Sequence, residues 1–551
     1  MKKLLSTIEK KVFFFFILLG INLILFRETL HIGFLSDDFH MLSVTAHQEG
    51  VLSYFTHNII GTRQGSSYGP LWNVLFSLEY LLFGLKAFFY HCLSVFFHST
   101  IAFFVFLLAK KFTQKEKIAF GAAILFSVFP GHVEAISWIS VQVHLLASLL
   151  FLLALYFYVC FLEEKKGTYY FMSLLFSFGS LLTKEIGVTF FLAICLLELF
   201  YVGFTHSGNL FERIGSFCLR ALKRIILPFV ILVAYFMLRI YATGVFAGSY
   251  SKSSFSFNFF TYFKTFLEIS LSIFLPFHWR NVAVSFLTSH LFFFGVGFVI
   301  LVFVILFLKK WRKTLLLLLS LYGVTALPYL ELSLNPVNYE GERYGYLVSV
   351  WMAIILATSF YVLLEKWQRR RVGVQIFWLC IFAMSFFLGI FSYQKIPLWK
   401  TSGEMVQKII KSGQTLSIPK DTFIYFIGMP DNIDGAQVMR NGIFEVLEIF
   451  SGQHLQGKRV GMFSYFLKDT MSDPYIRVQN TKMGYVLESD SKLSFTGFPE
   501  LSEEHFHFIL KDFTMPGFLG SSIEIERIQS QESPEMARFV YFNGEALQEI
   551  E

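Results

Sequence analysis

Residues 12–38 read VFFFFILLGINLILFRETLHIGFLSDD, a long apolar run that ends in two adjacent carboxylates, Asp37 and Asp38. The run is long enough to cross a hydrocarbon core about 30 Å thick. Two pairs of lysines precede it, and it lacks the small residues of a signal-peptide cleavage site. We therefore expect an uncleaved first membrane helix, with the acidic pair just outside it.

The rest of the chain shares this apolar character. Of its 551 residues, 55% are hydrophobic and only 15% are charged, whereas a soluble protein carries about 25% charged residues. A segment at 259–276 is also apolar, but one more crossing there would invert every later loop, so we expect a re-entrant or interfacial helix. We predict about eleven membrane-spanning helices, at 12–30, 88–109, 118–130, 144–162, 169–184, 187–204, 225–242, 288–308, 314–330, 344–364 and 372–392.

Loop charges predict the orientation of these spans. Most Lys and Arg residues of the membrane region lie at the N-terminus and in alternate loops, including 110–117, 205–224 and 366–371. We therefore place the N-terminus in the cytoplasm, and an odd number of spans puts the C-terminal part outside. The net charge of +7 follows from this topology and gives no evidence for nucleic-acid binding. The five cysteines show neither a disulfide framework nor metal-ligand spacing.

The composition changes near residue 393. We predict a transmembrane domain over 1–392, a linker helix region over 393–420 and a soluble extracytoplasmic domain over 421–551. In this last part, short β-favouring segments alternate with Gly, Pro and Asp turns, which predicts a small β-rich or α+β domain. The expected strands lie at 422–428, 459–466, 484–487, 506–510, 522–528 and 538–542, with a helix at 443–450.

The polar clusters of the membrane domain all fall on the predicted outer side. An ionisable residue at membrane depth costs about 2.5–3.5 kcal/mol by insertion scales, so such residues pair, line a wet cavity or carry out chemistry. Because they come from distant loops but share one depth, we predict a single site at the outer membrane face. Its candidate residues are Asp37, Asp38, His40, His132, Glu134, Lys184, Glu185, Glu340, Glu342 and Arg343.

Each candidate also has a structural interpretation. The acidic pair suits a helix N-terminus, Lys184 and Glu185 suit an internal ion pair, and His132 follows a Pro-Gly turn. Arg343 is the hardest to explain by structure alone, because a cation at a helix start opposes the helix dipole. The histidines of the N-terminal hundred residues lack the tight spacing of metal ligands, so they do not indicate a metal site.

Five segments resemble one family of membrane enzymes. Ser36-Asp37-Asp38 resembles the acidic pair in the first outer loop of GT-C glycosyltransferases. The motifs narrow the resemblance to the TMTC-like protein O-mannosyltransferases, without their TPR repeats, and cover roughly residues 12–400. They are Tyr68-Gly69-Pro70-Leu71 with Tyr90-His91 and His98, Pro130-Gly131-His132-Val133-Glu134-Ala135 with His144-Leu145-Leu146-Ala147, Leu181-Leu182-Thr183-Lys184-Glu185-Ile186-Gly187, and Glu342-Arg343-Tyr344.

The resemblance implies an inverting transfer of sugar from a polyprenyl-phosphate or dolichyl-phosphate donor to an acceptor hydroxyl of a protein, lipid or glycan. It implies that Asp37 or Asp38 is the base. Gly69 stands where the family has Arg, so that contact is either lost or supplied by Arg63. The need for a divalent metal stays open. Donor phosphate and sugar would be bound by Arg343, Lys184, His132, Glu134, Glu185, Glu342, Arg63 and Tyr68.

Two other classes of function remain as alternatives. A membrane transporter or channel would use the acidic and Arg residues as an ion or substrate pathway, although matching broken helices in two halves are not visible. A membrane scaffold would present the C-terminal domain. The compact tail without TPR repeats favours a bacterial cytoplasmic membrane, with the C-terminal domain in the periplasm.

Overall fold

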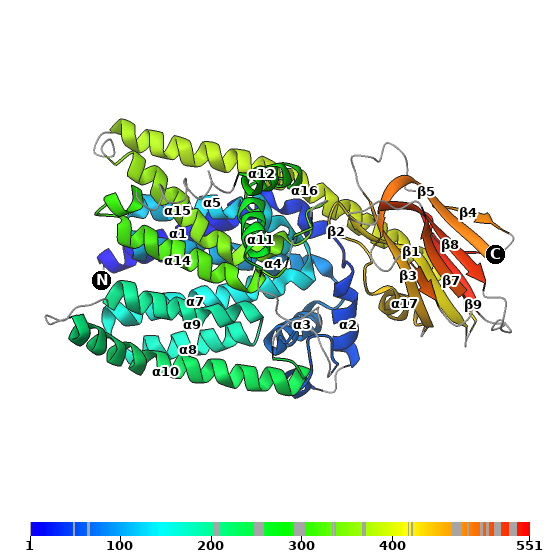
Figure 1. Cartoon of the computed structure of the whole chain (residues 1–551), viewed down its shortest axis with the longest axis horizontal. Helices are drawn as coiled ribbons and strands as arrows, with labels where there is room; N and C mark the ends of the chain where they lie inside the picture. Colours follow the sequence, from blue (N-terminus) through cyan, green and yellow to red (C-terminus); the bar gives the residue numbers. More distant parts are fainter. Residues whose placement is uncertain are drawn as a thin grey trace.

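The protein consists of a helical bundle followed by a mixed β-sheet (Figure 1). The N-terminus lies at one end of the bundle, and the sheet lies beyond the opposite end. The structure is a computed structural model. It describes residues 2–47, 50–62, 67–202, 210–246, 258–290, 304–332, 334–335, 338–365, 371–416, 418–419, 422–453, 455–465, 476–481, 484–495, 500–502, 506–511, 519–527 and 537–550.

Long apolar helices form the bundle. Among the described residues, five helices are long and apolar enough to cross a membrane, and a bent pair, Glu116–Ser127 with Pro130–Ser137, would make a sixth. A polytopic membrane protein is therefore confirmed, while the number of about eleven spans stays a prediction, since most of the span expected at 288–308 lies outside the described residues. The bundle helices are α1 (Lys2–Leu25), α4 (Ala87–Thr113), α5 (Glu116–Ser127), α7 (Gln142–Glu164), α8 (Gly167–Leu181), α9 (Thr189–Leu197), α10 (Leu210–Thr243), α14 (Arg312–Ala326), α15 (Tyr346–Leu363) and α16 (Arg371–Thr415).

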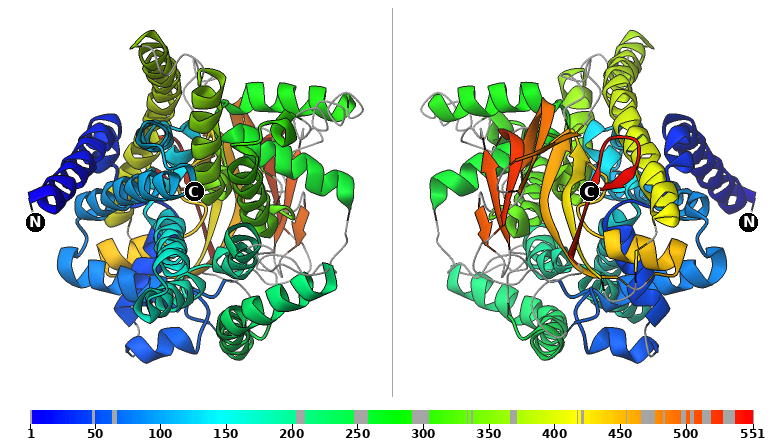
Figure 2. Two further views of the ribbon diagram at one scale, coloured as in Figure 1. Left: turned by 90° about the vertical axis from the view of Figure 1, so that its left-hand side faces the viewer. Right: turned by 90° about the vertical axis from the view of Figure 1, so that its right-hand side faces the viewer.

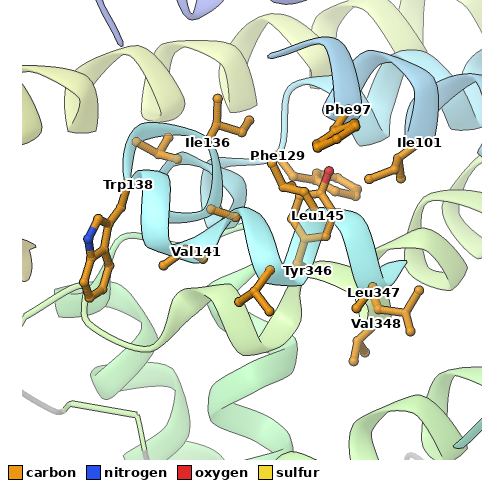
Figure 3. Close-up of a cluster of buried hydrophobic side chains, with 14 of the residues drawn as sticks. Phe97, Ile101, Phe129, Ile136, Trp138, Val141, Leu145, Tyr346, Leu347 and Val348 are labelled. Carbon is orange, nitrogen blue, oxygen red and sulfur yellow. The ribbon is translucent and has the colours of Figure 1, made fainter. Parts of the chain in front are cut away.

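A sharp bend follows α5 at Pro130. Residue Phe129, just before the proline, is extended (φ −64°, ψ 128°), as the proline ring requires. The chain then turns by 55° through short helical pieces, including α6 (Val133–Ser137), before α7 begins. Figure 3 shows the apolar cluster around this bend, with the Trp138 ring to one side. The side chains of this cluster are buried, so their packing holds the bend in place, and polar residues such as Glu134 lie on it.

Several helices lie across the bundle rather than along it. In Figures 1 and 2, α11 (Phe259–Ser272) and α12 (Phe277–Ser289) run across the long axis of the molecule, whereas α7 and α10 follow it. A helix is thus present in the segment 259–276, and its re-entrant or interfacial position in the membrane stays a prediction. Two shorter helices, α2 (Asp37–His47) and α3 (Pro70–Phe83), lie at the same end of the bundle as the sheet.

The last helix joins the two parts of the protein. We expected a span at 372–392 and a linker helix region over 393–420, and α16 is one helix of 45 residues that extends from the first into the second through Pro397. Proline lacks an N–H and so removes only one backbone hydrogen bond of the helix. Burial of Trp399, Val406 and Ile409 beyond it keeps the helix packed against its neighbours.

The described residues of the C-terminal part form a ten-stranded sheet, in which eight strands follow the order β10-β9-β1-β3-β5-β8-β7-β6, while β2 pairs with β1 and β4 pairs with β5. The central strand β1 runs parallel to β3 and β9, and the other pairs are antiparallel. All six expected strands and the expected helix α17 (Ile443–Ser451) are present. The strands are β1 (Phe423–Ile433), β2 (Ala436–Gln437), β3 (Gln456–Tyr465), β4 (Ile476–Asn480), β5 (Gly484–Phe495), β6 (Glu500–Ser502), β7 (Phe506–Lys511), β8 (Leu519–Arg527), β9 (Ala537–Phe542) and β10 (Leu547–Glu549).

Gly131 allows the bend to pack against α11. A Cβ at this position would lie 2.8 Å from the carbonyl oxygen of Ser272 and 3.1 Å from Cα of Ile273. We expect Gly131→Ala to lower stability by about 1–3 kcal/mol, because backbone atoms must move apart. Thermal unfolding of the detergent-solubilised protein measures this. The control is Gly323→Ala in α14, where no atom lies within 4 Å; equal melting temperatures for both variants would contradict the expectation.

Candidate active site

The acidic pair begins α2 from a strained turn. Ser36, the residue before Asp37, has a φ of +44°, a left-handed conformation that costs a residue with a side chain roughly 1–2 kcal/mol. The backbone N–H of Ser36 donates to the carbonyl of Val438 at 3.0 Å, which helps to hold the turn. The turn thus depends on a contact from the C-terminal part of the chain.

Asp38 points into the protein. It is fully buried, its Oδ2 accepts from the N–H of Leu35 at 2.8 Å, and its Oδ1 accepts from the N–H of Ser140 at 2.7 Å and from the Ser140 hydroxyl. Burial raises the pKa of Asp38 to about 7, and these hydrogen bonds act in the opposite direction. A pKa near 7 suits a general base, but a base must first reach its proton. Both oxygens of Asp38 are occupied, so its geometry is that of a structural anchor.

Asp37 points the other way, into a cavity of about 500 Å³. Its Oδ1 accepts a hydrogen bond from Nδ2 of Asn441 at 2.6 Å. None of the described residues donates to Oδ2 of Asp37. The polar members of the cavity wall are Asp37, His40, Ser67, Ser140, His144, Lys184, Arg343, Asn441, Glu445 and Arg459.

A second cavity, of about 900 Å³, adjoins the first. Three residues, His144, Lys184 and Arg343, line both. The walls of the second cavity are mainly apolar side chains from α9, α10, α11 and the 327–332 segment, including Phe191, Leu192, Leu232, Phe236, Phe263, Phe266, Leu327 and Leu330. We call the first cavity the polar cavity and the second the apolar cavity. They meet at two cations, Lys184 and Arg343.

Carboxylates hold both of these cations in place. Glu134, on the bend, accepts from the backbone N–H of Arg343 at 2.8 Å and from its guanidinium. The guanidinium also lies over the rings of Trp138 and Tyr344, at 5.5 and 4.8 Å from their centres. Such a two-sided arrangement fixes the planar fork of Arg343 before any ligand binds.

Lys184 is held more loosely than Arg343. Its Nζ lies 3.7 Å from Oε2 of Glu185 and 3.4 Å from the hydroxyl of Ser67. Glu185 has a closer partner in Arg239, at 2.7 Å. The charge of Glu185 is therefore shared, which leaves Lys184 available to a further anion.

Other predicted site residues support the walls instead of lining them. His132 is buried and its Nε2 bonds the Ser349 hydroxyl at 2.7 Å. Glu342 is buried in an ion pair with Lys395 at 2.6 Å. Tyr68 donates to the carbonyl of Phe55 at 3.1 Å and lies against Tyr235. None of these residues lines either cavity. Arg63 lies outside the described residues.

Gly69 has a structural reason to differ from the family pattern. A Cβ at residue 69 would lie 2.7 Å from the backbone carbonyl oxygen of Thr183, the residue before Lys184. Real Cβ atoms do not approach a carbonyl so closely. The arginine of the family therefore does not fit this backbone arrangement, and Lys184 owes its position partly to the absent side chain.

Several residues that the sequence analysis missed contribute to the site. Asn441, Glu445 and Arg459 come from the C-terminal part and line the polar cavity. The Asn441-Gly442 pair is a turn signal, but nothing in the sequence links it to Asp37. Lys395 stands alone in an apolar stretch, which could have marked it as a buried partner for a carboxylate. Across the described ranges, no group of three His, Cys, Asp or Glu residues is arranged to hold a metal ion.

The chain is similar to protein O-mannosyl-transferases of the TMTC type, which confirms the resemblance seen in the sequence. No protein-family model matches. The chain is 32% identical to protein O-mannosyl-transferase TMTC1 of Mus musculus over 142 residues, which are 24% of this chain and 15% of that protein. It is 28% identical to protein O-mannosyl-transferase TMTC3 of Mus musculus over 190 residues, covering 32% and 20%. The matches thus cover at most a fifth of either relative.

One of the solved structures matched with this chain superposes on it only weakly. It is the archaeal oligosaccharyltransferase AglB from Archaeoglobus fulgidus, in complex with an inhibitory peptide and a dolichol-phosphate. The superposition has a TM-score of 0.46 and 13% sequence identity, and it covers 81% of this chain and 64% of that one.

The two carboxylates should respond differently to amide substitution. In Asp38→Asn, either amide orientation sets an NH₂ group against a backbone N–H, of Leu35 or of Ser140, which costs about 1–3 kcal/mol. We expect Asp38→Asn to unfold at a lower temperature than the wild type, and Asp37→Asn to unfold at a similar one. Thermal unfolding of both variants measures this difference. A stable Asp38→Asn protein would show that Asp38 is not an anchor.

Proposed function

We propose that this chain is an inverting GT-C glycosyltransferase that moves a sugar from a polyprenyl-phosphate donor to an acceptor hydroxyl at the outer face of the membrane. The observation that carries this proposal is the junction of the two cavities at Lys184 and Arg343. A lipid-linked sugar has an apolar chain, a phosphate and a polar sugar in that order. The apolar cavity, the cations and the polar cavity follow the same order.

Each part of the donor finds a matching environment. The prenyl chain would lie in the apolar cavity, where burial of each CH₂ group contributes about 0.8 kcal/mol. The phosphate would bind between Lys184 and Arg343, since a guanidinium fork and an ammonium both suit phosphate oxygens. The sugar would then occupy the polar cavity that Asp37 lines.

Asp37 is the proposed base. Its Oδ2, to which none of the described residues donates, would take the proton of the acceptor hydroxyl while the acceptor oxygen forms a bond to the anomeric carbon of the sugar. The bond from that carbon to the phosphate oxygen breaks, and the lipid phosphate leaves with the electron pair. Lys184 and Arg343 stabilise its developing charge, as preorganised cations do in a site that excludes water. One carboxylate suffices because the phosphate leaves without being protonated.

The names of the relatives favour mannose as the sugar and a protein Ser or Thr as the acceptor. A lipid or glycan hydroxyl would use the same chemistry. We place the N-terminus in the cytoplasm and the sheet domain outside, in a bacterial cytoplasmic membrane. The transporter alternative is not favoured, because the similar proteins are glycosyltransferases.

Replacement of the base should abolish transfer while the protein still folds. We expect Asp37→Asn to lower the rate about 10²–10⁴-fold, the usual contribution of a positioned base. The assay follows release of free polyprenyl phosphate from a polyprenyl-phosphate-linked mannose, with the purified protein in lipid nanodiscs and membrane extract as the source of acceptor. Full activity of this variant would remove Asp37 as the base.

Replacement of Lys184 should mainly weaken binding of the donor. We expect Lys184→Gln to raise the KM for the lipid-linked donor about 10- to 100-fold, as expected for the loss of one charged hydrogen bond. Glu185 keeps Arg239 as its partner, so the variant leaves no unpaired carboxylate. Lys264→Gln in α11 is the matched control, since Lys264 also lies 3.7 Å from a glutamate but lines neither cavity. An unchanged KM in Lys184→Gln would exclude a phosphate contact.

A further inference from the structure

The C-terminal domain touches the turn that carries Asp37. The contact is made by a short segment, residues 438–442, which links β2 to α17 and which we call the strap. Two hydrogen bonds join the strap to Ser36. The Val438 carbonyl accepts from the Ser36 N–H, and the Asn441 N–H donates to the Ser36 hydroxyl at 3.2 Å. A Cβ on Gly442 (φ +90°) would lie 2.7 Å from the Ser36 carbonyl oxygen. The two backbones are therefore in direct contact.

Charged groups fix the strap on its other side. Arg440 donates to Asp431 at 2.6 and 2.7 Å and to Glu340 at 3.0 Å, so that it joins the domain to the outer loop that carries Arg343. The N–H of Tyr339 in that loop also donates to the Asp434 carbonyl at 3.1 Å. These contacts seat the domain without using the side chain of Asn441.

The side chain of Asn441 is used for a different contact. Its Nδ2 donates to Oδ1 of Asp37, and its Oδ1 accepts from Nη1 of Arg459 at 3.3 Å. A guanidinium only donates and an ionised carboxylate only accepts. The amide of Asn441 therefore satisfies both neighbours in only one orientation, with nitrogen toward Asp37.

This chain of hydrogen bonds constrains the Asp37 carboxylate. With Oδ1 held by Asn441, rotation of the carboxylate is restricted and Oδ2 stays directed into the cavity. A base that is held in its reacting orientation loses less freedom on reaching the transition state. Arg459 acts one step further back, because it stops the Asn441 amide from turning round.

We propose that Asn441 and Arg459 are a positioning pair, supplied by the C-terminal domain, that holds the Asp37 carboxylate in its reacting orientation. The proposal rests on the assignment of Asp37 as the base. It gives the sheet domain a part in the active site, and it accounts for a docking contact made at the one turn that carries the acidic pair.

The test compares Asn441→Ala with the wild type in the same nanodisc assay. We expect kcat to fall about 10- to 100-fold with little change in the donor KM, because a charged hydrogen bond is lost away from the phosphate. Removal of a donor also raises the pKa of a carboxylate. The acidic limb of the kcat/KM profile should therefore move to higher pH in the variant.

The pH profile separates positioning from mere docking. A variant that only weakened the docking of the C-terminal domain would lower activity without moving the acidic limb of the kcat/KM profile. The groups that face Asp37 are the same in both proteins, so the difference between the profiles belongs to Asn441. These groups are Asp38 and His40 of α2, Glu445 of α17 and Arg459 of β3, with His144, Lys184 and Arg343 across the cavity.

Three further variants complete the design. Asn480→Ala, exposed on β4, is the matched control and should keep wild-type kinetics and pH profile. Asn441→Asp keeps the shape of the side chain, so it serves if the alanine variant does not fold, and it should move the limb further because two carboxylates then face each other. Arg459→Gln should lower kcat alone but add little in the Asn441→Ala background, as expected for residues that act in series.

An unmoved limb and an unchanged kcat in both Asn441 variants would overturn the positioning role and leave Asp37 as the base. Full transfer by Asp37→Asn would instead overturn the proposed base, and the positioning role with it. The two failures are therefore distinguishable within one set of measurements.

Discussion

The first turn of α2 is the constraint on which the site depends. Successive residues of a helix point about 100° apart, so two adjacent carboxylates cannot share one environment. Asp38 is turned inward, where backbone N–H groups and Ser140 surround it, and Asp37 is turned toward the cavity. The buried Asp38 carboxylate fixes the start of the helix, and the helix start directs the half-buried Asp37 toward the cavity. The strained φ of Ser36 persists because the strap holds it from outside.

The two cations illustrate a second physical balance. A charge at the edge of an apolar cavity is costly unless a partner compensates it, but a tight partner also competes with a ligand. Arg343 is held by the buried Glu134 through both its backbone and its side chain, so its position is nearly independent of ligand. Lys184 has looser contacts, with the Ser67 hydroxyl at 3.4 Å and with Glu185 at 3.7 Å, and Arg239 already binds that glutamate. Arg343 thus provides a fixed geometry, and Lys184 provides a positive charge that a ligand could pair with.

The sequence predicted most of the architecture, because its signals are local. Apolar runs mark the membrane helices, and alternating β-favouring segments mark the strands. The cluster of ionisable residues could also be predicted, since such residues are conspicuous in an apolar chain. Four of its members, Asp37, His40, Lys184 and Arg343, do line the polar cavity.

Long-range contacts could not be predicted in the same way. Asn441 meets Asp37 across 404 positions, and an ordinary Asn-Gly turn carries no sign of such a partner. The burial of His132, Glu342 and Tyr68 depends on tertiary packing, which motif spacing does not report. The division of roles within the acidic pair likewise depends on which way α2 enters the fold.

The close approach of Gly69 to the backbone of Thr183 limits the substitutions that residue 69 can accept. Its backbone leaves no room for any side chain beside Thr183, so a single substitution cannot restore the arginine of the family without displacing the residue next to Lys184. Any side chain at residue 69 would therefore require a concerted change in two segments that are distant in the sequence. The backbone position of the residue before Lys184 is thus tied to a glycine.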